Sequence, residues 1–159
     1  MKNLKTIFAT MILCLGIAAA FTSCSDDDDD NPAIPAAKSI VGTYNGDMTC
    51  SVMGSESVFE AVTVSVAATD DATVTVAVSS FGNPPMQIPE IKIPGIKVSG
   101  SNEKYSLAAT EFSGTTAEGK TYSGTLQGNL DNNILTVRIN LQYGAMPMPI
   151  ICTFSSNKK

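Results

Sequence analysis

The fold is decided by residues 121–143, TYSGTLQGNLDNNILTVRINLQY. In both halves of this stretch apolar side chains recur at even spacing, which is the pattern of a β-strand with one buried face. Between the halves, Asp131-Asn132-Asn133 is a run that favours a tight turn. The alternating apolar residues are Tyr122, Leu126, Leu130, Leu135, Val137, Ile139 and Leu141. The stretch therefore predicts an antiparallel hairpin, and Arg138, on its polar face, is expected to point to solvent rather than to grip a ligand carboxylate.

The same alternation continues on both sides of this hairpin. Further strands are expected at residues 43–53, 58–66, 74–78, 104–110 and 150–154. In the second of these, parity places Val58 and Glu60 on the inward face. Residues 88–97 contain Pro89 and Pro94, which cannot donate ladder hydrogen bonds, so an edge strand, a bulged strand or a covering segment is expected there. About eight strands without crossover helices predict an all-β fold, a barrel or a sandwich, and the consecutive meander favours an antiparallel up-and-down barrel.

The apolar faces of these strands would line the inside of the barrel. An eight-stranded barrel is either filled by its own side chains or holds one small ligand, and the sequence leaves both open. Small residues at Gly46, Ala109, Gly124 and Gly128 fit extra space inside, but they equally mark strand bends. The residues expected to line a ligand site are Tyr44, Met48, Val62, Val64, Val76, Tyr105, Leu107 and Leu126.

Two cysteines, Cys50 and Cys152, fall on apolar-face positions of the first and last expected strands. These strands become neighbours if the barrel closes. Directly opposite residues of an antiparallel pair come close enough for a disulfide, and export would permit oxidation. The sequence leaves the bond open, with two buried free thiols as the favoured state.

The first 23 residues have the composition of an export signal. A positively charged start precedes an apolar run at residues 6–21, which is too short to span a bilayer comfortably. The small residues just before Cys24 resemble those of a bacterial lipobox. We therefore expect residues 1–23 to be a lipoprotein signal peptide and Cys24 to carry the lipid anchor.

An acidic run follows the expected lipidation site. Ser25, Asp26, Asp27, Asp28, Asp29 and Asp30 resemble the surface-export tag of Bacteroidetes lipoproteins. Residues 24–38 combine this tag with a Pro/Ala linker, which favours an extended connection. Residues 39–159 are expected to form the barrel domain. The protein is thus expected at the outer membrane, held by its lipid and exposed on the cell surface.

Together with this tag, two further stretches resemble the calycin-like β-barrel lipoproteins of Bacteroidetes. They are residues 40–46, IVGTYNG, and the late strand at residues 124–130, GTLQGNL. At Gly42-Thr43-Tyr44 a tyrosine stands where lipocalins carry the tryptophan of a Gly-x-Trp signature. The resemblance covers nearly all of the mature chain and implies a barrel that binds a small apolar ligand.

The composition argues against several classes of function. The chain has no His and a net charge of −5, and it shows no basic footprint for nucleic acid. No nucleophile–base pair, metal-ligand cluster or cofactor motif is recognisable, so we expect no enzyme, metal site or cofactor. The oligomeric state stays open.

Two hypotheses of function follow. The leading one is that the barrel binds a small hydrophobic ligand. The alternative is an accessory or adhesion lipoprotein that binds a protein or glycan by its outer surface, with a filled barrel. A filled interior would decide against the first hypothesis.

Overall fold

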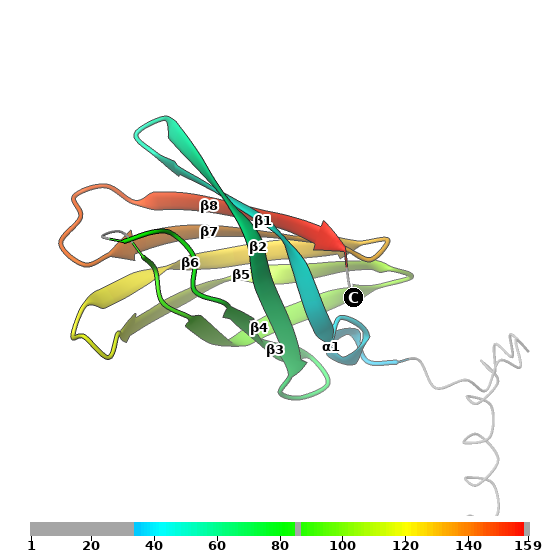
Figure 1. Ribbon diagram of the computed structural model, residues 1–159. Coiled ribbons are helices and arrows are strands. Elements are labelled where there is room, and N and C mark those ends of the chain that lie inside the picture. The colour runs from blue at the N-terminus through cyan, green and yellow to red at the C-terminus, as the bar shows by residue number, and fades with distance from the viewer. Residues whose placement is uncertain (1–33, 85–86, 158–159) are drawn as a thin grey trace, which may run out of the picture. The chain divides into compact units, whose positions relative to one another are not determined.

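Period-two alternation produces eight strands in the residues that the computed structural model describes, 34–84 and 87–157 (Figure 1). After a one-turn helix, α1 (Ala36–Ser39), they are β1 (Gly42–Val52), β2 (Ser55–Ala68), β3 (Thr73–Val78), β4 (Ile91–Ser101), β5 (Lys104–Thr115), β6 (Thr121–Asp131), β7 (Ile134–Tyr143) and β8 (Ile150–Asn157). Asn132 and Asn133 turn β6 into β7 with φ angles of 48° and 67°, a left-handed conformation that asparagine tolerates. The predicted hairpin is therefore confirmed.

The eight strands form one closed antiparallel barrel in sequence order. Closure is made by β1 and β8, which pair from Asp47 opposite Ser155 to Ser51 opposite Ile151. Every other pair of neighbouring strands is consecutive in the chain. The all-β, up-and-down barrel is thus confirmed over the sandwich.

A bulge in β2 changes the inward face of that strand. Gly46 lies opposite Val62 but Met48 lies opposite Phe59, so β2 has one extra residue at this point. Ala61 has a φ of 57°, the left-handed conformation of a bulged strand. The prediction that Val58 and Glu60 face inward is wrong, because the bulge reverses the alternation: both are exposed.

The proline-containing segment forms β4, and β4 is bulged. Its register against β3 shifts between Val74 and Val76, opposite the stretch that contains Pro94. This confirms one of the three forms expected there. Against β5, β4 pairs only from Val98 to Ser101. Among the described strands, residues 91–97 of β4 and 108–115 of β5 therefore have no ladder partner on the side where the two strands diverge.

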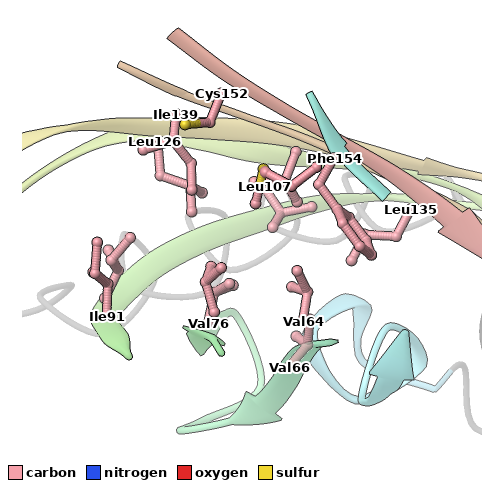
Figure 2. Packing of buried hydrophobic residues seen from close by; sticks show 14 of the residues in the cluster. Val64, Val66, Val76, Ile91, Leu107, Leu126, Leu135, Ile139, Cys152 and Phe154 are labelled. Atoms are coloured by element: carbon pink, nitrogen blue, oxygen red, sulfur yellow. The ribbon is translucent and has the colours of Figure 1, made fainter. Parts of the chain in front are cut away.

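The core lies between β2–β4 on one side and β6–β8 on the other. Figure 2 shows Val64, Val76 and Ile91 pointing toward Leu126, Leu135 and Phe154. Buried side chains come from all eight strands. The apolar faces read from the sequence thus meet in one cluster, which is the main source of stability in such a fold.

The two ends of the barrel differ in construction. At one end lie α1 and the short turns at 69–72, 102–103 and 132–133, and Ala37 and Ile40 are fully buried there (Figure 1). We call this the closed end. The other end carries the β1–β2 turn at residues 53–54 and the connections at residues 79–90, 116–120 and 144–149, and we call it the far end.

Candidate functional site

The predicted ligand-lining residues lie in the core. Seven of them (Tyr44, Met48, Val62, Val64, Val76, Leu107 and Leu126) are buried, and Tyr105 is half-buried. Tyr44, Met48, Val64, Val76 and Leu126 have no exposed surface at all. Water therefore cannot touch these five side chains, either from outside or from a cavity within the barrel. In the described part of the chain, these side chains fill the space where a ligand would sit.

The small residues expected on the inner faces do not create space. The prediction for Ala109 is wrong, because a register shift in β5 between Leu107 and Thr110 leaves it exposed. A side chain on Gly124 would collide with the backbone oxygen of Asn140 and come within 3.0 Å of the Phe112 ring. A side chain on Gly46 would meet Cβ of Ser156 at 2.5 Å, and one on Gly128 would meet the oxygen of Thr136 at 2.5 Å. These glycines allow neighbouring strands and aromatic rings to approach closely, which is the role expected of glycine in bent strands.

Tyr44 is the polar anchor of the closed end. Its side chain is fully buried, and its hydroxyl donates a hydrogen bond of 2.8 Å to the carbonyl oxygen of Ile40. Burial raises the pKa of Tyr44 above its ordinary value, so the phenol stays a neutral donor. Tyr44 thus links the segment that enters the barrel to β1 and does not line a ligand site.

The far end has a hollow of about 550 Å³ between two connections and the end of β7. Polar side chains on its wall come from residues 79–90 and from the β5–β6 turn, and Tyr143 of β7 contributes an aromatic ring. The lining includes Gln87, Glu90, Thr116, Glu118, Lys120 and Tyr143. Two prolines, Pro84 and Pro89, add apolar surface. We call this the far-end hollow.

Lys120 organises one wall of the far-end hollow. Its ammonium lies 5.9 Å from the centre of the Tyr143 ring and 3.5 Å from a carboxylate oxygen of Glu118. Glu90, another residue of the lining, lies 3.3 Å from Lys92 of β4. These pairs are exposed, and such pairs contribute only about 0–1 kcal/mol to stability. Their carboxylates and ammonium groups are therefore free to exchange partners with a bound molecule.

No motif in the sequence points directly to the far-end hollow. Its residues are scattered over residues 80–143, and none forms a recognisable motif. The available signal was indirect: the proline-rich connection after residue 82 and an aromatic residue, Tyr143, at the end of a strand. Long connections held by a rigid sheet are where binding residues concentrate.

Other predicted positions are located as follows. Cys50 lies directly opposite Cys152, a register that the sequence left open, and in the structure both are buried, free thiols. Arg138 is exposed on β7, as predicted. Cys24 and the acidic residues from Ser25 to Asp30 lie outside the described residues, as does the signal segment.

No group of three or more His, Cys, Asp or Glu side chains in residues 34–84 and 87–157 is arranged to hold a metal ion. In the same part of the chain, no helix has the length and apolar character that crossing a bilayer demands.

Comparison with known proteins places the barrel in a family. Residues 40–157 match the model of the calycin-like β-barrel domain. A crystal structure of a candidate outer membrane protein from Bacteroides fragilis superposes with a TM-score of 0.70 at 20% identity, over 79% of this chain. The match spans 53% of that protein's length, and at this identity it establishes the shared fold alone. The comparison with curated proteins gave no match.

Proposed function

The chain belongs to the calycin-like β-barrel domain family, and on that premise we propose that it is a lipid-anchored surface protein that binds a glycan at the far-end hollow. The observation that carries this proposal is the filled interior. With the core packed, binding falls to the outer surface, where residues 80–90, residues 116–120 and Tyr143 form a hollow with polar and apolar walls.

The filled interior argues against a small hydrophobic ligand. Such sites are cavities of roughly 300–1,000 Å³ lined mainly by apolar side chains. The apolar side chains that would line one here are packed against each other instead. Native mass spectrometry of the protein from its host should therefore show no bound lipid, and a retained lipid-sized mass would overturn the filled interior.

The chemistry of the far-end hollow suits a carbohydrate. Sugar hydroxyls donate to carboxylates and accept from ammonium and amide groups, and Glu90, Glu118, Lys120 and Gln87 offer these partners. Tyr143 and the two prolines offer apolar surface to the C–H faces of a sugar ring. A protein partner would need roughly 800 Å² on each side, more than a hollow of this kind supplies by itself.

The test is binding of soluble polysaccharides, measured by affinity electrophoresis with a panel of neutral and acidic polymers. A Glu118→Ala/Lys120→Ala variant should lose at least tenfold in affinity for a polymer that the wild type retards. A matched control is Lys38→Ala/Asp71→Ala, which removes an exposed ion pair of 2.7 Å at the closed end. Equal affinity of both variants would place the binding elsewhere. Failure to bind any polymer, with capture of a protein by cross-linking on whole cells, would favour the protein partner.

The location follows from Cys24 and the acidic run after it. Acyl chains on one cysteine hold a protein strongly, since each buried methylene contributes about 0.8 kcal/mol. Cys24→Ala should move the protein from the membrane fraction to the soluble fraction. Deleting residues 26–30 should leave it in the membrane but protect it from protease added to whole cells. Continued membrane fractionation of Cys24→Ala would refute the anchor.

A further inference from the structure

The closure of the barrel differs from its other strand junctions. Seven neighbouring pairs of strands are consecutive in the chain and are joined by their connections. The eighth pair, β1 with β8, has no such link, because these are the first and last strands. Five residue pairs make this junction. Its two strands are paired in space but lie at opposite ends of the barrel sequence.

A pair of cysteines lies within this junction. Cys50 of β1 is directly opposite Cys152 of β8, and their exposed fractions are 5% and 0%. Directly opposite residues of an antiparallel pair have Cα atoms about 4.5–5.5 Å apart, which falls within the range of about 4.4–6.8 Å that disulfides span. Both side chains lie on the inner face, in the same cluster as Met48 and Phe154.

The two thiols also interact with each other. A hydrogen bond with Cys50 is the largest cause that raises the pKa of Cys152, and burial adds to it. In the closed barrel the thiolate, which is the reactive form, is therefore scarce and inaccessible. Oxidation would have to occur while the strands are pairing, before the core excludes the oxidant.

We propose that Cys50 and Cys152 form a disulfide that joins the first strand of the barrel to the last. This inference rests on the proposed function in one respect, because export brings the folding chain into an oxidising compartment. In the presence of an oxidised thiol, such as glutathione disulfide, one cysteine thiolate attacks the disulfide and releases one glutathione thiol. The second cysteine then attacks the mixed disulfide and releases the other, so two thiols are oxidised and one disulfide is reduced.

Such a disulfide would stabilise the barrel more than a disulfide that closes a short loop. It closes a loop that contains all seven strand connections, and the stabilisation by a disulfide grows with the length of the loop it closes. In an oxidised protein we expect a thermal midpoint higher by on the order of 10 °C than in the reduced protein.

The experiment refolds the full chain from denaturant with glutathione redox buffer or with excess reductant. Free thiols are then alkylated, and peptides from a non-reducing digest are identified by mass spectrometry, which separates this pair from Cys14 and Cys24. We expect a peptide linking Cys50 to Cys152 after oxidative refolding, and a drop in the thermal midpoint on reduction. Oxidant added after reductive refolding should act far more slowly. Alkylation of both cysteines after oxidative refolding would overturn the proposal.

Two controls keep the result interpretable. In a Cys50→Ala/Cys152→Ala variant, reductant should no longer shift the midpoint; if that variant fails to fold, the wild type with and without reductant still decides. The chain is also isolated from the envelope of its host with thiols trapped at lysis. A disulfide that forms on refolding but is missing in the host would support the pairing of Cys50 with Cys152 and would count against export. The disulfide and the export of the chain can therefore be refuted independently.

Discussion

The closed end and the far end of the barrel differ in the polarity of their side chains and in the length of their connections. The closed end combines fully buried Ala37, Ile40 and Tyr44 with short turns. The far end combines longer connections with exposed Glu118 and Lys120 and a hollow of about 550 Å³. The buried side chains of the closed end are inaccessible to water, and the charged side chains of the far end are accessible to it.

This difference separates stability from binding along one molecule. Burial of apolar surface and satisfied buried hydrogen bonds hold the closed end together. At the far end, exposed charges contribute little to stability, so their positions can serve recognition instead. Changes at the closed end should therefore affect unfolding, and changes at the far end should affect binding alone.

The largest expected effect is that of Tyr44→Ala. Removing a fully buried aromatic ring leaves a cavity, and such changes lower the free energy of unfolding by about 3–5 kcal/mol. Urea denaturation followed by circular dichroism measures this. A loss below about 1 kcal/mol would show that the closed end is not a stability centre.

Tyr44→Phe tests the contribution of the Tyr44 hydroxyl alone. It keeps the ring but removes the hydroxyl that donates to Ile40, leaving a buried carbonyl without its partner. We expect a loss of about 1–2 kcal/mol in the free energy of unfolding. An unchanged urea midpoint would mean that the hydrogen bond adds nothing beyond the packing of the ring.

A smaller effect is expected at Asp70, in the turn beside α1. The hydroxyl of Thr73 donates to its carboxylate at 2.6 Å, and the N–H groups of Ala72 and Thr73 donate at 2.8 and 2.7 Å. These bonds, that from the Thr73 hydroxyl first, lower its pKa below the ordinary 3.8. A lowered pKa stabilises the fold above pH 3.8, and this contribution is lost as the pH falls through the folded pKa.

The variant Asp70→Asn tests this pH dependence. Its stability should vary less than that of the wild type when thermal midpoints are compared between pH 6 and pH 2. Parallel curves for the two proteins would contradict the assigned role of the carboxylate.

The smallest effect on stability is expected from Glu118→Ala/Lys120→Ala at the far end. Both side chains are exposed, and surface changes away from special features stay within about 0.5 kcal/mol. The urea midpoint should match that of the wild type while polysaccharide binding falls. A large loss of stability would break the division between the two ends.

Much of the fold could be predicted because the alternation of the sequence is strong. Strand positions, the turn at Asn132-Asn133 and the pairing of the first strand with the last all follow from period two and a meander. The register that sets Cys50 opposite Cys152 does not follow from them. On the N-terminal side of Ala61, the inward face of β2 could not be predicted. The bulge there depends on a positive φ at Ala61, and an alanine in a sequence does not indicate a positive φ. One-turn α1 is too short to show helical periodicity, and it overlaps residues expected to be linker.

The candidate site could be predicted far less well. Whether a barrel is hollow depends on the combined volume of side chains from eight strands, which no local pattern records. The far-end hollow depends on where two connections and the end of β7 come together in space, and only the folded sheet determines this.

The divergence of β4 from β5 has a consequence for how copies of the protein meet. Unpaired backbone groups along residues 91–97 of β4 could template the addition of a strand from another molecule. That edge carries exposed Lys92 and Lys97 with Pro94 between them. Two such edges repel each other electrostatically, and the proline offers no N–H for pairing. Where copies of the protein are crowded, Lys92, Pro94 and Lys97 would thus discourage aggregation through the open edge of β4.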